Sequence, residues 1–223
     1  MTGPLASLRR LSPALAAALV LGAAGFAAPR PSPAAATPAV ATTAPADWLA
    51  GITAPHRQLF DAPAPEGGVP LVHVMNYYDT YNRAFGVKDA DVDGVLTFYG
   101  ATTFHGVNDA MWAKYRIGEF LQATDGATGQ PALANPWRAA PVILGGAIPA
   151  ASIESLQKRG ATFILCNNAL TIFSGMLAQA RGLDPKVVYE DLKANVLPGV
   201  VVVPAMVIAI EQAQAAGLSY HRQ

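Results

Sequence analysis

Four consecutive valines near the C-terminus constrain the possible folds of this chain more than any other feature. Val200–Val203 follow a Pro-Gly pair and precede Pro204, so the run has the length of a single β-strand. Its residues do not alternate between polar and apolar, and a strand of this kind is covered on both faces. The run therefore predicts a mostly parallel sheet that lies between two layers of helices.

Strand-like and helix-like segments alternate along the chain, which predicts an α/β fold. Short apolar runs predict strands at 71–75, 92–99 and 161–165, and 141–144 favours one more short strand. Helical spacing, with Asn or Asp before some segments and Gly after others, predicts helices. These helices cover 108–121, 152–159, 169–181, 184–195 and 205–216.

The N-terminus resembles an export signal. Arg9 and Arg10 precede an apolar run of 18 residues, Leu11–Ala28, and small residues follow it. We expect residues 1–28 to be removed and the protein to be periplasmic or secreted. The paired arginines leave the Sec and Tat routes undistinguished. Because 18 apolar residues are also about the shortest length that spans a bilayer, an uncleaved anchor is the alternative.

Residues 29–68 are predicted to be a tether followed by an irregular segment. The first part is almost all Pro, Ala and Thr, and cannot bury enough apolar surface to fold. Pro55, Pro63 and Pro65 favour an irregular course in the second part. The folded domain is therefore expected to cover residues 69–223. Within it, 124–140 lacks any periodicity and is predicted to be a long loop of the kind that often forms a lid or an interface.

Charge and composition exclude several classes of function. Lys plus Arg and Asp plus Glu each total 15, but residues 1–36 hold three arginines and no acid, so the remainder is mildly acidic. Such a chain has no electrostatic footprint for nucleic acid or anionic lipid. The four histidines are not closely spaced, and neither a Walker loop nor a Gly-x-Gly-x-x-Gly motif is present, so we expect no metal and no cofactor.

Cys166 is the sharpest candidate for chemistry. A single cysteine excludes an internal disulfide and a Cys-x-x-Cys pair. The residue directly follows the predicted strand 161–165, and Asn167 and Asn168 separate it from the next helix. A thiol at a helix N-terminus loses its proton more readily than a free thiol. Cys166 is therefore either a reactive nucleophile, with Asn167 or Asn168 capping the helix beside it, or a buried residue that only packs.

The same part of the chain resembles the DsrE/DsrF-like family over residues 150–221. The resemblance rests on the strand that ends in Cys166-x-Asn168, on Gly182, on the valine run with Pro204, and on Gly217 and Tyr220 before the end. It implies a flavodoxin-like three-layer sandwich, a homo-oligomer, and sulfur carried as a persulfide on Cys166. A persulfide carrier with one cysteine needs a thiol or persulfide partner. The export signal and the loop 124–140 depart from the family pattern.

Polar residues near other predicted strand ends could line the same edge of the sheet. His105, in the turn after 92–99, could donate or accept a proton near neutral pH, or it could simply pack. Asn108 is a helix N-cap by its position and a candidate binding residue, and Asn76 follows the predicted strand 71–75. Trp112, Tyr115 and Phe120 suit a core or a subunit interface.

Three functions therefore remain open from the sequence. In the first, Cys166 is a sulfur carrier. In the second, the strand-end residues bind a small ligand without catalysis. In the third, the domain is an oligomeric accessory protein with an inert thiol. Whether solvent reaches Cys166 separates the first two.

Overall fold

The structure of the protein is a computed structural model, which describes residues 48–223. Five strands form one sheet in the order β6-β5-β2-β1-β7, and every neighbouring pair is parallel. The predicted export signal and the first part of the predicted tether lie outside the described residues. The strands are β1 (His56–Asp61), β2 (Val92–Phe98), β5 (Thr162–Cys166), β6 (Val200–Val203) and β7 (Ser219–Arg222).

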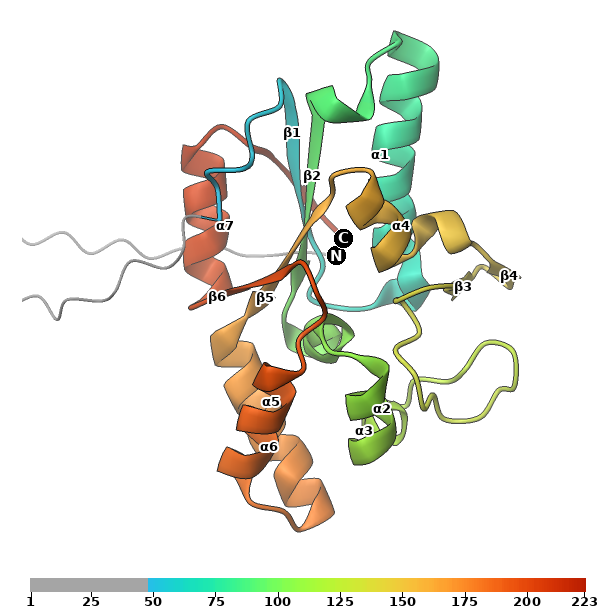
Figure 1. The fold of residues 1–223 in the computed structure, drawn as a ribbon, viewed down its shortest axis with the longest axis vertical. Helices are drawn as coiled ribbons and strands as arrows, with labels where there is room; N and C mark the ends of the chain where they lie inside the picture. Colours follow the sequence, from blue (N-terminus) through green and yellow to red (C-terminus); the bar gives the residue numbers. More distant parts are fainter. Residues whose placement is uncertain (1–47) are drawn as a thin grey trace, which may run out of the picture. The chain divides into compact units, whose positions relative to one another are not determined.

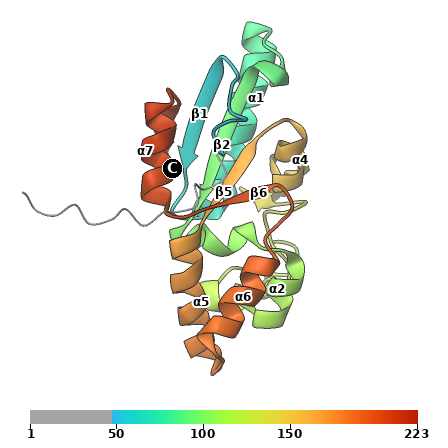
Figure 2. The ribbon, with the colours of Figure 1, turned by 60° about the vertical axis from the view of Figure 1, so that its left-hand side comes forward.

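Helices cover both faces of this sheet. Figures 1 and 2 show α1 (Val69–Phe85) and α4 (Ile153–Lys158) on one side and α7 (Met206–Ala215) on the other. Two separate sets of buried side chains fill the two interfaces: one includes Leu71, Leu96 and Leu156, and the other Ile164 and Met206. The predicted α/β class, a flavodoxin-like three-layer sandwich with a parallel sheet, is confirmed.

A second group of helices lies beyond the carboxyl ends of the strands, at the bottom of Figure 1. It begins with a 3-10 turn that directly follows β2 and packs against α5 and β5. This arrangement puts a helical layer next to the edge of the sheet where ligands bind in parallel α/β folds. Its members are η3 (Gly100–Gly106), α2 (Asp109–Tyr115), α3 (Ile117–Leu121), α5 (Asn167–Arg181) and α6 (Pro185–Ala194).

The folded body starts earlier than the sequence predicts. Trp48 and Ile52 are buried under α7, and 56–61 forms β1, a strand with neighbours on both sides. The prediction of an irregular segment up to residue 68 was therefore wrong for residues 56–61, and the folded domain begins before residue 69. Pro55 and Pro63 flank β1 rather than interrupt it, so the prolines mark its ends and not its absence.

The predicted strand at 71–75 was also wrong, because these residues belong to α1. Leu71, Val74 and Tyr78 are fully buried and follow each other at helical spacing. Pro70 stands in the first turn, where a helix tolerates it, and Gly86 ends the helix with a left-handed φ of 68°. The helical spacing of apolar residues becomes visible only over about two turns. The five-residue run 71–75 was too short to show it.

The predicted helix 108–121 is two helices. Arg116 adopts a left-handed φ of 51° and separates α2 from α3. The guanidinium of Arg181, from the last turn of α5, donates to the carbonyl oxygens of Tyr115 and Arg116. This contact satisfies the backbone acceptors at the end of α2, and it joins residues 65 positions apart, so it could not be inferred from local periodicity.

Two smaller differences concern strands. Val142–Ile143 (β3) pairs only with Gly146–Ala147 (β4), in a small antiparallel hairpin outside the main sheet. The sequence also gave no sign of β7, whose four residues are all exposed along the edge of the sheet. The remaining predicted strands and helices are present, with Asn108, Ser152 and Asp184 as side-chain N-caps.

Candidate functional site

Parallel pairing brings the ends of β1, β2 and β5 to one edge of the sheet, as predicted for the turn at 100–106 and for Asn167. The hydroxyl of Thr102 ties two of these ends together. It accepts a hydrogen bond from the backbone N–H of Tyr99, and it lies 2.6 Å from the carbonyl oxygen of Ala62, just after β1. The turn that carries His105 is therefore fixed to the centre of the sheet.

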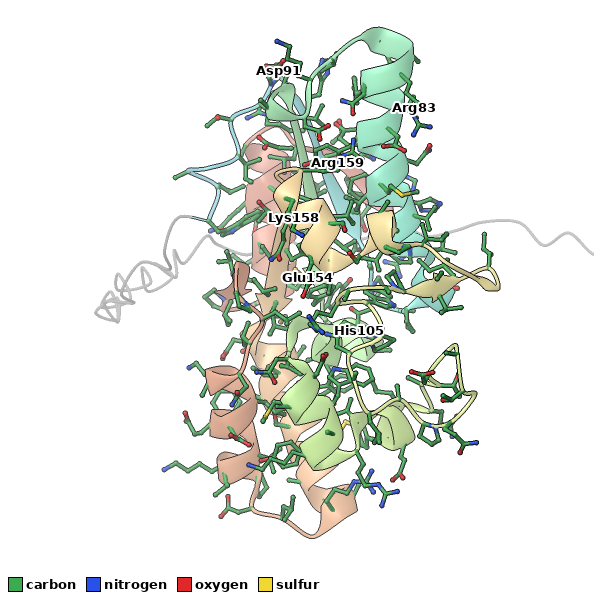
Figure 3. The ribbon with its side chains drawn as sticks, turned by 45° about the vertical axis from the view of Figure 1, so that its right-hand side comes forward. Arg83, Asp91, His105, Glu154, Lys158 and Arg159 are labelled. Atoms are coloured by element: carbon green, nitrogen blue, oxygen red, sulfur yellow. The ribbon has the colours of Figure 1, made fainter. Side chains whose placement is uncertain are left out.

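His105 is held inside this turn rather than on its surface. Only 2% of the residue is exposed, and its ring lies 4.1 Å from the ring of Trp137 and 5.4 Å from that of Trp112, centroid to centroid. Figure 3 shows it in the interior, apart from surface charges such as Arg83. The imidazole is thus enclosed by two indole rings.

The protonation state of His105 follows from these surroundings. Burial lowers its pKa from 6.5 to about 3, so the ring is neutral at neutral pH. Its Nδ1 lies 3.3 Å from the carbonyl oxygen of Thr102, an acceptor, so Nδ1 carries the proton and Nε2 is left as an acceptor. A neutral imidazole with a lowered pKa favours the alternative that His105 packs, and its roles in proton transfer and in binding both stay predictions.

A cavity of about 340 Å³ lies beside this imidazole, and we call it the His105 cavity. Its walls come from the loop after β1, from η3, from the residues after α3, and from the long loop 124–140 with the two residues that follow it. This volume is at the lower end of the range for small-molecule sites. The lining residues are Pro65, Gly67, Gly68, Ala101, His105, Leu121, Gln122, Ala123, Thr124, Gly126, Pro136, Trp137, Pro141 and Val142.

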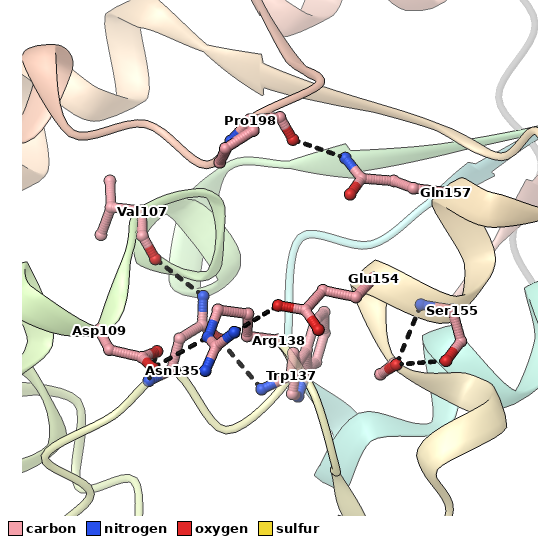
Figure 4. A network of polar contacts seen from close by, with 10 residues as sticks. Val107, Asp109, Asn135, Trp137, Arg138, Glu154, Ser155, Gln157 and Pro198 are labelled. Atoms are coloured by element: carbon pink, nitrogen blue, oxygen red, sulfur yellow. Dashed lines mark hydrogen bonds and ion pairs between the residues drawn. The ribbon is translucent and has the colours of Figure 1, made fainter.

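Asn135 fastens the long loop over the cavity. Its side-chain amide donates to the carbonyl oxygens of His105 and Val107, and its Oδ1 accepts from the backbone N–H of Trp137. Arg138, three residues after Asn135, forms ion pairs with Asp109 and Glu154. These ion pairs link the loop to α2 and α4 (Figure 4). The loop is thus a fixed wall, and the prediction of a long loop without helical periodicity holds for this segment.

Asn135→Asp is expected to detach this wall. The exchange preserves side-chain size but turns the amide that donates to two carbonyl oxygens into a carboxylate oxygen that can only accept. Since a buried polar group without its partner costs about 1–3 kcal/mol, we expect a loss of roughly 2–4 kcal/mol in unfolding free energy, measured by urea denaturation. Limited proteolysis should then cut within 124–140.

Asn76→Asp is the matched control, because Asn76 is exposed on α1 and, among residues 48–223, its side chain bonds only Thr80. It should change stability by less than about 0.5 kcal/mol. Equal effects of the two substitutions would contradict the role given to Asn135.

Cys166 ends β5 and is itself the N-cap of α5, in the place where the sequence suggested Asn167 or Asn168. Its Sγ accepts the backbone N–H of Ala169 at 3.4 Å and that of Met206, the first residue of α7, at 3.3 Å. Two helix N-termini therefore converge on the sulfur. The residue is 5% exposed, packs in the core under α7, and does not line the His105 cavity.

The four candidate asparagines are not assembled into one site. Asn167 accepts a hydrogen bond from the hydroxyl of Tyr189, and the backbone N–H of Asn168 bonds the carbonyl of Pro204. Asn108 caps α2 and donates to Asn195. Asn76 lies in α1 and lines a separate open groove of about 390 Å³ between α1 and the edge of the sheet. Asn76 therefore does not share a rim with Cys166.

Sequence reasoning missed the residues that close the His105 cavity. Gly67 and Gly68, with left-handed φ of 60° and 89°, form the turn into α1. A Cβ on Gly68 would lie 2.8 Å from Ile143, which explains why only glycine fits there. Trp137 follows Asn-Pro in a loop made mostly of small and polar residues. This single tryptophan was the sequence feature that could have indicated the cavity wall.

Within residues 48–223, no helix is long and apolar enough to cross a membrane. In the same residues no three side chains of His, Cys, Asp or Glu gather as a metal site would require. Of the two alternatives for the large aromatic side chains, the structure favours the core: Trp112 and Tyr115 are buried in it, and the partly buried Phe120 packs against it.

Comparison with known proteins adds little to this geometry. No family model matches the chain, and no curated protein matches it. Among solved structures, a protein of unknown function from Methanobacterium thermoautotrophicum is similar at 16% sequence identity and a TM-score of 0.33, over 75% of this chain and 99% of that one. The site's own geometry is therefore what supports a function.

Proposed function

We propose that the protein is an exported domain that binds a small molecule in the His105 cavity. One observation carries this proposal: a nearly fully buried, uncharged imidazole lines a cavity at the carboxyl edge of a parallel sheet. Buried polar groups are normally hydrogen-bonded, and within residues 48–223 the imidazole forms its hydrogen bond through Nδ1, which leaves Nε2 for a ligand.

The location supports the same function. Ligands of parallel α/β folds bind at the carboxyl ends of the strands, and the cavity follows β1 and β2. A histidine that remains neutral at physiological pH is suited to recognition rather than to proton transfer. We therefore propose binding without catalysis.

A fragment screen followed through the indole N–H signal of Trp137 tests this proposal. We expect some fragments to shift this NMR signal in the wild-type protein. Ala101→Leu enlarges an exposed residue of the cavity lining and should abolish the shifts while leaving the fold intact. If no fragment moves the Trp137 signal, or if Ala101→Leu binds as well as the wild type, the proposal is contradicted.

A second candidate, the persulfide carrier that the DsrE/DsrF-like resemblance implies, is favoured by the contacts of Cys166. Two peptide N–H groups at helix N-termini would stabilise negative charge on Sγ. A thiolate there would take sulfane sulfur from a donor persulfide and release the donor as a thiol. The low exposure of Cys166 opposes this role, since a donor persulfide must reach Sγ.

Alkylation by iodoacetamide separates the two roles of Cys166. Because the residue is 5% exposed, we expect native protein to react at least about a hundredfold more slowly than protein unfolded in urea. Mass spectrometry that finds added sulfur on Cys166 in native protein, absent in Cys166→Ser, would instead support the carrier. Cys166→Ser should bind cavity fragments unchanged.

Export is the proposed localisation, on the strength of the Arg9-Arg10 pair and the apolar run up to Ala28. N-terminal sequencing of fractionated protein should find a start within the small residues that follow the run. Intact Met1 in the membrane fraction would support the anchor instead.

Self-association is proposed as well, now through α5. Ile172 and Met176 lie one turn apart and are 61% and 49% exposed. Light scattering at micromolar concentration should give a mass above that of one chain, and Ile172→Glu should reduce it. A monomer mass for the wild-type protein would contradict the proposal.

A further inference from the structure

The lining of the His105 cavity carries no formal charge. None of its fourteen residues is Asp, Glu, Lys or Arg. Eight are Pro, Ala, Leu, Val or Trp, and three are glycines, so the polar side-chain groups of the lining belong to His105, Gln122, Thr124 and the indole N–H of Trp137. A charged ligand group would lose its hydration in this cavity without gaining an opposite charge, which is costly.

The imidazole in the lining of the cavity can accept a hydrogen bond at Nε2 but cannot donate one there. Nδ1 of His105 faces the carbonyl of Thr102, so Nε2 is unprotonated. A carboxylate or phosphate oxygen would place two acceptors against each other. A hydroxyl or N–H of the ligand would satisfy Nε2.

The nearby N-terminus of α1 does not offer an anion site. The N–H of Gly68 bonds the carbonyl of Pro65 at 2.7 Å, the N–H of Val69 bonds the carbonyl of Glu66, and Pro70 has no N–H. Two of the N–H groups at this helix start are therefore used within the turn, and a third is absent because of Pro70. Glu66 adds a negative charge to the same turn.

We infer that the His105 cavity selects an uncharged small molecule that donates one hydrogen bond to Nε2 of His105. This inference rests on the proposed function and specifies its ligand class. The indole ring of Trp137, next to His105 in the wall, suits a planar ring of the ligand.

Three probes of similar size test the ligand class: phenol, which is uncharged and donates; toluene, which is uncharged and does not; and benzoate, which is anionic. Each is titrated into the wild-type protein at pH 7.5, and the indole N–H signal of Trp137 is followed by NMR. We expect phenol to bind about tenfold more tightly than toluene, because toluene leaves Nε2 unpaired, and benzoate to bind more weakly than both.

His105→Phe retains a ring and removes the acceptor. It should bind toluene at least as well as the wild type and lose the preference for phenol, and circular dichroism checks that the variant is folded. His221→Phe, at an exposed position of β7 outside the cavity, should keep the wild-type preference.

The outcomes separate the ligand class from the function. Equal binding of phenol and toluene, tighter binding of benzoate, or a preference for phenol that survives His105→Phe would overturn the ligand class while leaving a binding cavity. Absence of a Trp137 shift with all three probes and with the fragment screen would overturn the function itself. Should His105→Phe fail to fold, the comparison of the three probes in the wild-type protein still decides the ligand class.

Discussion

Gly118→Ala is expected to destabilise the protein by about 3 kcal/mol, which corresponds to a fall of roughly 10 °C in Tm for a domain of this size. Gly118 lies in α3, and a Cβ there would stand 2.3 Å from the carbonyl oxygen and 2.5 Å from the nitrogen of Ala132. Both are backbone atoms of the long loop and cannot turn aside as a side chain would. The loop must therefore move off α3, or α3 must move.

The same substitution should weaken binding in the His105 cavity. The loop approaches α3 at Gly118, and the hydrogen bond from the N–H of Ala132 to the carbonyl of Ala123 continues this contact into the cavity wall. Gly118→Ala should consequently reduce fragment binding, as seen at the Trp137 signal. Thermal unfolding followed by circular dichroism measures the loss of stability.

Gly175→Ala is the matched control for Gly118→Ala. Gly175 also lies inside a helix, but a Cβ on it would meet no atom within 4 Å. Since alanine favours a helix over glycine by roughly 1 kcal/mol, this control should be neutral or stabilising. If both alanines behaved alike, the close approach of the loop to α3 would be disproved.

The second large effect is a loss of stability in mild acid caused by His105. Its pKa is about 3 when folded and 6.5 in the unfolded chain. Between these values the unfolded chain binds a proton that the folded protein does not. The stabilisation is therefore complete above pH 6.5 and is lost as the pH falls toward 3.

The slope of this loss approaches about 1.4 kcal/mol per pH unit, or roughly 1–2 kcal/mol between pH 6.5 and 5. Most carboxylates titrate below this window, so the change within it reports on histidines, and substitutions of single histidines assign it to His105. Urea denaturation at half-unit steps of pH measures the slope. His105→Gln, which cannot take up a proton, should flatten it, whereas His221→Gln should not. An unchanged slope in His105→Gln would show that the imidazole is not held neutral.

Elements whose signals are local could be predicted from the sequence. The valine run of β6, the caps Asn108 and Asp184, and glycine stops such as Gly182 act within a few residues, and each appears in the structure as expected. The alternation of strands and helices then decided the α/β class, because a strand that is apolar on both faces needs helices above and below it.

Elements that depend on residues far away in the sequence could not be predicted. β1 joins the sheet although its sequence, His-Arg-Gln-Leu-Phe-Asp, does not alternate clearly, because β2 and β7 supply its hydrogen bonds. β7 is an exposed edge strand with no apolar pattern of its own. The break at Arg116 depends on Arg181 from another helix.

The same distinction between local and long-range contributions applies to the candidate site. The sequence determined that the turn of His105 and the end of β5 at Cys166 would reach the same edge, because parallel pairing follows from the apolar strands. Only the tertiary structure decided that His105 is buried between two tryptophans and held neutral, that Cys166 is sealed under α7, and that Asn76 lies elsewhere. Burial and protonation depend on which distant side chains pack around a group, and that packing exists only in the folded chain.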